Sequence, residues 1–237
     1  MANYDTFGKF YDAVMGDRRK SARQLQEFIR KANPNANNLL ELGCGTGSVL
    51  KHLAKDYEVW GVDLSRKMLS IAKKKVPQAR LFKQDMVKFR LPHRFDVICC
   101  VFDSINHVLS FTAWKKLFAN VSEHLAENGV FIFDINTQKK LNRHIAEPAW
   151  IHEFGNNLLI MKITAARGNR SNWHIRVFEL VRANRYLLHE ETIQEVSFSQ
   201  HKIANALRVQ FRRVEIIDTD RMRPCSESER LFFVCKR

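Results

Sequence analysis

Three glycines at alternate positions follow an apolar run and an acidic residue in Asn38-Leu-Leu-Glu-Leu-Gly-Cys-Gly-Thr-Gly-Ser48. Glycine tolerates backbone angles that other residues resist, so a ligand can come close to the main chain of such a turn. The dinucleotide fingerprint G-x-G-x-x-G would require Gly or Ala where this chain has Ser48. The Glu41 carboxylate repels a pyrophosphate but suits a ligand that carries an ammonium and a sulfonium. The stretch therefore predicts a cradle for a cationic cofactor.

Acidic residues also end the apolar segments that follow. Val59-Trp-Gly-Val-Asp63 has the pattern of a second strand, and a carboxylate at its end can accept hydrogen bonds from both hydroxyls of a ribose. Ser65 is placed to cap the next helix. Ala79–Met86 and Phe95–Phe102 have the patterns of a third and a fourth strand. Ligands bind at the carboxyl ends of parallel strands, so the acids there are expected to line one rim. These acids are Glu41, Asp63, Asp85 and Asp103.

The elements that must position these acids alternate between strand and helix patterns. This alternation predicts a parallel sheet with right-handed crossovers. A helical region over residues 8–32, with a break near Gly16, precedes the first strand. The expected core elements are strand 38–42, helix 46–55, strand 58–62, helix 66–75, strand 79–84, strand 95–101, helix 111–126 and strand 129–135.

The pattern changes beyond about residue 150. Three apolar or alternating runs, separated by turns rich in Gly and Asn, predict an antiparallel layer with one face in water. Alternation places Trp173 and His174 on opposite faces of this layer, and the sequence leaves open which face lines a pocket. The runs are 158–164, 172–181 and 188–197. The last expected elements are helix 199–208, strand 209–218 and strand 230–236.

In order and spacing, these segments resemble the motifs of the class I S-adenosylmethionine-dependent methyltransferases. The resemblance implies an α/β fold with a Rossmann-like, seven-stranded, mostly parallel sheet and helices on both faces. The antiparallel layer would be inserted between the fifth and sixth core strands. The chain would then be one methyltransferase domain over 1–237. Its parts would be an N-terminal helical lid (1–33), a cofactor-binding core (34–148), the inserted layer (149–200) and the C-terminal part of the core sheet (201–237).

The same resemblance implies roles for the residues around the glycine turn. Glu41 and the turn backbone would hold the methionine part of S-adenosylmethionine, and Asp63 would take its ribose diol. Asp85 would accept a hydrogen bond from the adenine amine, and Met86 with Met68 or Leu64 would sandwich the ring. For the methionines the alternative is core packing, and for Asp63 it is helix capping. The expected cofactor-binding residues are Tyr11, Glu41, Gly43, Cys44, Gly45, Gly47, Asp63, Leu64, Met68, Asp85, Met86, Phe102 and Asp103.

The segment Phe102-Asp-Ser-Ile-Asn-His107 is expected to face the methyl acceptor. It lacks the (D/N/S)-P-P-(Y/F) motif, which grips planar amines, and the Pro-Cys nucleophile of cytosine methylation. It resembles small-molecule N-methyltransferases, including those of amino sugars, which carry a histidine in a similar segment. An amine must lose a proton before it attacks, and His107 or a nearby carboxylate could take it. The alternative for His107 is capping or packing. Tyr11 is the second catalytic candidate, as a lid residue that reaches the carboxylate end of the cofactor, and its alternative is aromatic packing.

The formal net charge of +14 raises the question of an anionic partner. The basic residues are dispersed along the chain, which favours a solvated basic surface over a binding patch. Two other functions stay open: an RNA or protein methyltransferase that uses this surface, and a non-catalytic cofactor-binding subunit. Salt-dependent retention of RNA would favour the first.

Composition sets the remaining expectations. The five cysteines include no C-x-x-C pair, so we expect reduced thiols, no metal site and a cytoplasmic protein. The sequence has neither a membrane-length apolar run nor a secretory pattern at its N-terminus, so no membrane partner is expected. The expected partner is a small-molecule methyl acceptor, the expected product is S-adenosylhomocysteine, and the protein would be a monomer or a homodimer.

Overall fold

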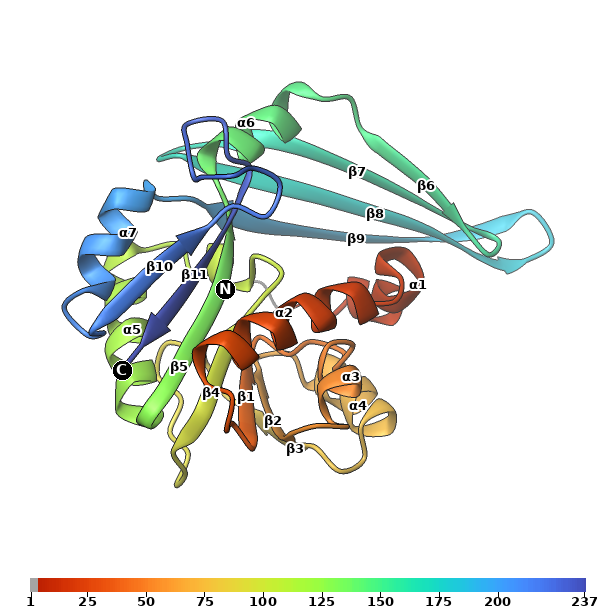
Figure 1. Cartoon of the computed structure of the whole chain (residues 1–237). Coiled ribbons are helices and arrows are strands. Elements are labelled where there is room, and N and C mark those ends of the chain that lie inside the picture. Colours follow the sequence, from red (N-terminus) through yellow and green to blue (C-terminus); the bar gives the residue numbers. More distant parts are fainter. Residues whose placement is uncertain (1–3) are drawn as a thin grey trace.

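The computed structural model describes residues 4–237 and contains two β-sheets (Figure 1). The larger sheet has seven strands in the order β10-β11-β5-β4-β1-β2-β3. All of its pairings are parallel except the two that β11 makes, with β5 and with β10. Its strands are β1 (Asn38–Leu42), β2 (Glu58–Asp63), β3 (Arg80–Lys83), β4 (Phe95–Cys100), β5 (Leu125–Asn136), β10 (Arg213–Ile217) and β11 (Arg230–Lys236).

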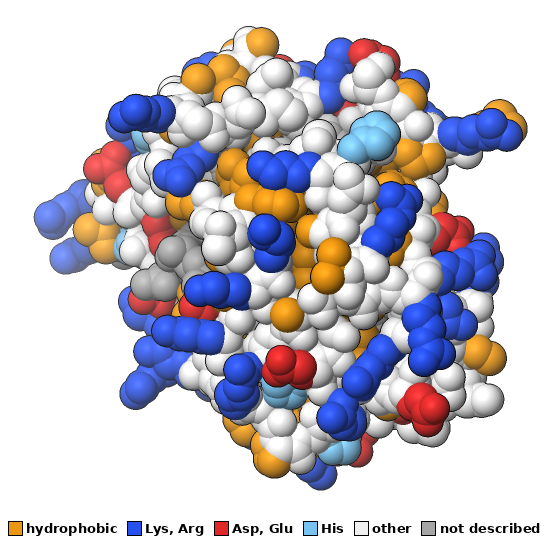
Figure 2. Space-filling model, turned by 90° about the vertical axis from the view of Figure 1, so that its left-hand side faces the viewer, with side chains coloured by type: hydrophobic (Ala, Val, Ile, Leu, Met, Phe, Trp, Pro, Cys, Tyr) orange, Lys and Arg blue, Asp and Glu red, His pale blue; other side chains and the backbone are white. Residues whose placement is uncertain are grey.

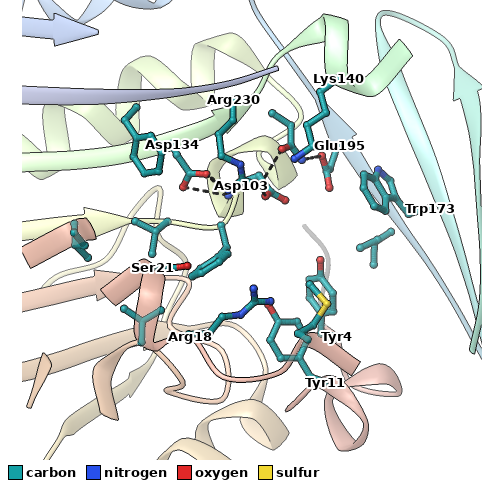
Figure 3. Close-up of a pocket in the computed structure, with 18 of the residues that line it drawn as sticks. Tyr4, Tyr11, Arg18, Ser21, Asp103, Asp134, Lys140, Trp173, Glu195 and Arg230 are labelled. Atoms are coloured by element: carbon teal, nitrogen blue, oxygen red, sulfur yellow. Dashed lines mark hydrogen bonds and ion pairs between the residues drawn. The ribbon is translucent and has the colours of Figure 1, made fainter. Parts of the chain in front are cut away.

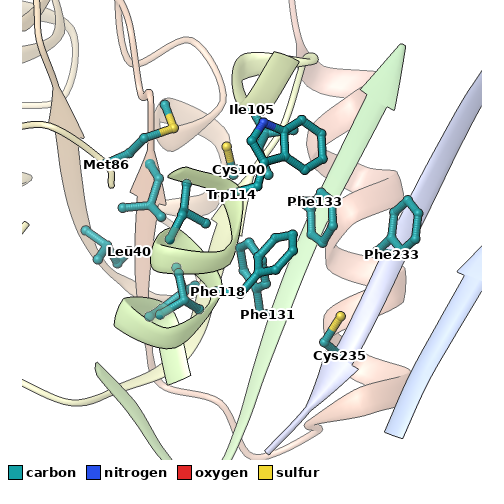
Figure 4. Close-up of a cluster of buried hydrophobic side chains, with 14 of the residues drawn as sticks. Leu40, Met86, Cys100, Ile105, Trp114, Phe118, Phe131, Phe133, Phe233 and Cys235 are labelled. Atoms are coloured by element: carbon teal, nitrogen blue, oxygen red, sulfur yellow. The ribbon is translucent and has the colours of Figure 1, made fainter. Parts of the chain in front are cut away.

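Helices cover both faces of this sheet because successive residues of its strands point to opposite sides. One face packs on α5 (Phe111–His124) and α7 (Gln200–Leu207), in the aromatic cluster around Phe131 and Phe133 (Figure 4). The other face packs on α2 (Arg19–Ala32), α3 (Leu50–Leu53) and α4 (Arg66–Lys75). The sheet therefore has an apolar layer on each side, as the expected fold requires.

The second sheet is antiparallel and lies between β5 and β10 in the chain, which confirms the expected inserted layer. It follows α6 (Gln138–Ala146) and contains four strands. In Figure 1 it extends above the core sheet, and α1 (Tyr11–Met15) lies beneath it. Its strands are β6 (Trp150–Phe154), β7 (Asn157–Ala166), β8 (Arg170–Arg182) and β9 (Arg185–Val196).

Several expected elements differ from the structure. The helix expected at 46–55 is shorter in the structure and consists of α3 alone. It starts at Leu50 because the glycine turn and its continuation occupy the residues up to Val49. The N-terminal helical region begins with a short 3-10 helix, η1 (Phe7–Lys9). The helix α1 ends at Met15, and the φ of +67° at the next residue, Gly16, confirms the expected break. The strand expected at 209–218 begins only at Arg213. The sequence analysis missed α6 and β6.

Within residues 4–237, no helix has both the length and the apolar character needed to cross a bilayer. All five cysteines are free thiols.

Candidate cofactor and acceptor site

The glycine turn follows β1 and leaves its backbone open to one side. Gly43, Gly45 and Gly47 all have positive φ, between +52° and +73°. A Cβ at Gly45 would meet no atom within 4 Å, whereas one at Gly43 would lie 3.0 Å from the Ser104 side chain. Gly45 therefore presents bare main chain to empty space, where a ligand can approach closely.

Asp63, the last residue of β2, ties this turn to the next strand. Its Oδ2 accepts a hydrogen bond from the backbone N–H of Gly45 at 2.9 Å, and its Oδ1 accepts one from Ser65 at 2.8 Å. Burial raises the pKa of Asp63, against the opposing effect of these backbone donors. Ser65 also caps α4 as expected, because its hydroxyl accepts a hydrogen bond from the N–H of Met68.

Glu41 lies on β1 beneath the turn and is only 3% exposed. Its Oε2 has no hydrogen-bond partner among the described residues. Burial and the neighbouring Asp63 carboxylate raise the pKa of Glu41 well above its usual range. A buried carboxylate without donors is costly, and a cationic group of a ligand would offset that cost.

A first cavity opens above the turn and gathers most of the residues expected to bind a cofactor. Its lining includes eight of them, Tyr11, Gly43, Gly45, Asp63, Leu64, Met68, Met86 and Phe102, together with the catalytic candidate His107 and with Tyr4, Val62, Gln84 and Ser104. Asp85 does not line it, and its Oδ1 accepts a hydrogen bond from the N–H of Val87 at 2.9 Å. Glu41, Cys44 and Gly47 do not line this cavity, and Asp103 lines a second one.

The N-terminal segment is held over the turn by a polar cluster. Asp12 accepts hydrogen bonds from the hydroxyls of Thr46 and Ser48 at 2.6 and 2.7 Å, and its other oxygen pairs with Lys75 at 2.6 Å. Burial alone would raise the pKa of Asp12, but these donors outweigh it and lower the pKa. Ser48, which departs from the dinucleotide fingerprint, thus helps to hold the N-terminal segment on the glycine turn. The role of Lys75 was missed because it depends on a contact between distant segments.

Arg18 is another residue that sequence reasoning missed. Its guanidinium lies over the Phe102 ring, with Cζ 4.2 Å from the ring centroid. Its Nη2 is buried and has no hydrogen-bond partner among the described residues. Figure 3 shows the guanidinium beside the Tyr11 hydroxyl and directed towards the second cavity. This arrangement can receive an anionic group such as a carboxylate.

The second cavity has a volume of about 450 Å³ and lies between the N-terminal segment, the core sheet and the inserted layer (Figure 3). Tyr4, Tyr11 and Phe102 line both cavities and therefore mark where they meet. The inserted layer contributes Met161, Trp173, Ile175, Ile193 and Glu195. The pocket-facing side of the layer is thus the face of Trp173, a point that the sequence left open.

Arg230, at the start of β11, organises the charged wall of this cavity. It pairs with Asp103 at 2.7 Å and also with Asp134, and it donates to the Asn136 side chain at 3.2 Å. Burial raises the pKa of Asp134 to about 6 despite the arginine. In Asp103 the arginine and Lys140 outweigh burial, so its pKa is lowered. At neutral pH both acids are largely ionised, so the arginine offsets only part of their charge and the group stays net negative.

His107 lies in the short 3-10 helix η2 (Ser104–His107), with both ring nitrogens engaged. Nδ1 is 3.0 Å from the Gln194 carbonyl oxygen, which can only accept, so Nδ1 carries the proton. Nε2 lies 2.9 Å from the Tyr4 hydroxyl and accepts from it. Burial lowers the pKa of His107, which favours this neutral form. To take a proton from an acceptor, Nε2 would have to release Tyr4.

Three titratable groups converge where the two cavities meet. One ligand atom each of Asp103, His107 and Glu195 lies within 4.8 Å of the others. Donors of this kind can hold a metal ion, but Arg230 already pairs with Asp103 and Tyr4 already occupies Nε2 of His107. The cluster therefore brings together groups that can exchange protons, at the junction of the two cavities.

Basic side chains are dispersed over at least one face of the molecule (Figure 2). Figure 2 shows Lys and Arg side chains scattered over one whole face, with hydrophobic and uncharged surface between them. A nucleic-acid partner is usually met by a clustered basic face. On this face the basic residues are dispersed, as they are along the sequence.

Comparisons with known proteins agree with the geometry. A family model described as a methyltransferase domain matches residues 39–129. A dTDP-3-amino-3,4,6-trideoxy-alpha-D-glucopyranose N,N-dimethyltransferase of Streptomyces venezuelae is 31% identical over 131 residues, which are 55% of each chain. The chain thus spans about half the length of this relative. The putative methyltransferase YqeM of Bacillus subtilis is 29% identical over 99% of this chain and 97% of its own. An S-adenosylmethionine-dependent methyltransferase of Clostridium acetobutylicum superposes with a TM-score of 0.85 at 26% identity, over 98% of both chains.

Proposed function

We propose that this chain, which belongs to the S-adenosylmethionine-dependent methyltransferases, transfers the methyl group of S-adenosylmethionine to an amine nitrogen of a small molecule. The observation that carries the proposal is the junction of the two cavities. One cavity opens on the bare backbone of the glycine turn and the Asp63 carboxylate, and the other is lined by acids and aromatic rings. A methyl group held at the junction would face an acceptor in the second cavity.

The residues around the glycine turn and the junction of the two cavities fit the cofactor. Glu41 would pair with the ammonium of its methionine part, and Arg18 and the Tyr11 hydroxyl would receive its carboxylate. Asp63 would take the ribose diol, since each carboxylate oxygen keeps a further lone pair beyond its backbone donor. Met68, Leu64 and Met86 would contact the adenine ring, with Gln84 or Asp85 at its amine.

When bound, the cofactor supplies a methyl group already activated by its sulfonium, so the protein needs no nucleophile of its own. The residues must align acceptor and methyl and exclude water. The lid serves this purpose, because Asp12 and Tyr4 fasten it across the junction. His107 would hold Tyr4 in place and, if Tyr4 moved, could also act as a base. A positive charge near the sulfur would not stabilise the transition state for methyl transfer. The positive charge of the Arg230 guanidinium is offset by its ion pairs with Asp103 and Asp134.

The acceptor we favour is an amine on a sugar-sized molecule. A cavity of about 450 Å³, which must also hold the methionine end of the cofactor, suits a metabolite rather than a polymer. The acids at the junction suit an acceptor that arrives as an ammonium. The Streptomyces relative is named for an amino-sugar substrate, so a nucleotide-linked amino sugar is the first acceptor to test.

We expect label from [methyl-¹³C]S-adenosylmethionine to appear as an N-methyl signal when the purified protein is given a dTDP-3-amino sugar. The matching 3-hydroxy sugar nucleotide should accept little label, because it offers no amine. Product spectra and the release of S-adenosylhomocysteine measure both. Labelled RNA or protein, without label in any small amine, would contradict the proposal and favour the polymer alternative. Binding of the cofactor with no transfer to any acceptor would favour a non-catalytic subunit.

Glu41→Gln gives a second prediction, in which stability and affinity change in opposite directions. The folded-state pKa of Glu41 lies above its ordinary value of 4.5, so its carboxyl costs stability as the pH rises above that value. The melting temperature of the variant relative to the parent should therefore increase as the pH rises above 4.5. Affinity for S-adenosylmethionine should fall, because the amide cannot pair with the ammonium. Melting curves and calorimetric titration test both, and unchanged affinity would remove Glu41 from the cradle.

A further inference from the structure

Glu195 is a buried carboxyl on the inserted layer that faces the acceptor cavity. Along β9 it shares the inward face with Ile193 and Glu191, and it is only 2% exposed. Glu191 has a structural partner, since it accepts a hydrogen bond from the N–H of Phe7 at 2.9 Å. Glu195 accepts one from the Asn136 side chain at 3.1 Å and lines the cavity (Figure 3). Because the Glu195 side chain faces a cavity, it is not needed to fill the hydrophobic core.

The surroundings of Glu195 make it a strong proton acceptor. Burial and the Asp103 carboxylate raise its pKa well above the usual range, and the Asn136 donor, Lys140 and Arg230 oppose this only in part. No carboxylate oxygen among the described residues lies within ion-pair distance of Lys140. The titratable and charged groups that face Glu195 are Tyr4, Asp103, His107, Lys140 and Arg230.

The other candidates at the junction are less suited to take a proton. Asp103 is paired with Arg230, which keeps it ionised but makes it a weak base. Asp134 is fully buried and pairs with the same arginine. His107 has both nitrogens engaged. Among these four residues, only Glu195 combines two features: its side chain is directed into the cavity, and it pairs with no cationic side chain of the described residues.

We propose that Glu195 binds the ammonium of the methyl acceptor and removes its proton, which makes it a catalytic residue contributed by the inserted layer. This inference rests on the proposed function. The acceptor class is an aliphatic amine that is protonated in water at neutral pH. Asp103 lies close enough to share the ammonium, and Lys140 would contact an oxygen elsewhere on the acceptor.

The proton and electron counts balance without a further reactant. The acceptor R–NH3⁺ gives one proton to the Glu195 carboxylate and becomes R–NH2. Its lone pair forms the new N–C bond while the C–S bond breaks and leaves its electron pair on sulfur. The products are R–NH2⁺–CH3 and S-adenosylhomocysteine, and Glu195 returns its proton to solvent when they leave. A second methyl transfer would repeat the same steps.

Binding of simple probes tests this role without knowledge of the natural acceptor. The protein is first saturated with S-adenosylhomocysteine, and cyclohexylamine or cyclohexanol is then titrated at neutral pH by ligand-observed NMR. We expect the parent to bind the amine at least about tenfold more tightly than the alcohol, because only the ammonium pairs with a carboxylate. Glu195→Gln should lose most of that preference, since only Asp103 remains to meet the ammonium, and should keep its affinity for S-adenosylhomocysteine. The glutamine oxygen can still accept from Asn136, so the fold is preserved.

Glu190→Gln is the matched control. Glu190 lies on the same strand, points to the outer face and pairs with Arg176. This variant should keep the parent's preference for the amine. An equal preference in the parent and in Glu195→Gln, or no preference in the parent, would overturn the proposal. Failure of the parent to bind S-adenosylhomocysteine would instead overturn the proposed function, so the two failures are distinguishable.

Turnover with the dTDP-amino sugar provides a second readout. At neutral pH, Glu195→Gln should lower kcat by about 10²–10⁴-fold, the usual contribution of a general base. Its rate should recover as the pH rises towards the pKa of the amine, because free amine then supplies the lone pair directly. A constant deficit at all pH values would indicate a structural role and would contradict the assignment.

Discussion

Gly45→Val is expected to abolish measurable binding of S-adenosylmethionine. The bare backbone at Gly45 faces empty space, and a branched side chain there would occupy the volume in which the cofactor approaches. Valine also resists the φ of +52° at this position, so the turn itself would be distorted. Calorimetric titration with S-adenosylhomocysteine should show no heat of binding. Gly45→Ala, which adds a single methyl group, should weaken binding by less.

Gly155→Val separates steric blocking from backbone strain. Gly155 lies in the turn between β6 and β7, has a φ of +55° and also has no atom near an added Cβ. Valine should strain this turn to a similar degree, since the φ angles are nearly equal. It should lower the melting temperature but leave the affinity for S-adenosylhomocysteine unchanged. Retained binding in Gly45→Val would show that the ligand does not approach this turn.

Asp63→Ala is expected to weaken cofactor binding by two orders of magnitude or more. The substitution removes two charge-assisted hydrogen bonds to the ribose diol, each worth about 1.5–3 kcal/mol. A loss of about 3 kcal/mol corresponds to roughly a hundredfold in affinity. The turn would also lose the bond between Asp63 and the N–H of Gly45, so the loss can exceed this value. Titration calorimetry with S-adenosylhomocysteine measures the change.

Asp96→Ala is the matched control for Asp63. Asp96 also accepts hydrogen bonds from two backbone N–H groups, those of Asn37 and Asn38, but at the opposite edge of the sheet. Its replacement should cost stability without changing affinity for the cofactor. If both alanine variants bound equally well, Asp63 would be only a structural residue of the turn.

The sequence was most informative where one strand or helix carries its own signals. β1, α4 and β11 have the expected bounds, 38–42, 66–75 and 230–236, because their apolar runs end at glycine, a capping serine or charged residues. The acids at the ends of β1 and β2 could be placed for the same reason. Parallel strands bring their carboxyl ends together whatever the details of packing.

The features that the sequence did not reveal depend on contacts between distant segments. Arg230 reaches Asp103 only because β11 runs antiparallel to β5 and brings its first residue to the end of that strand. The pairing of Lys75 with Asp12 depends on how the lid folds back. Glu195 had no local signal, because the sequence did not show which face of its strand would meet a cavity. Such residues can be found only once the register and the docking of the layers are known.

A crystal structure of the protein with S-adenosylmethionine would test the central claim most directly. We expect the ribose on Asp63, the ammonium on Glu41, and the sulfonium methyl directed through the junction towards Asp103 and Glu195. A cofactor bound elsewhere, or a methyl group that points away from the acid-lined cavity, would contradict transfer to an amine held in that cavity.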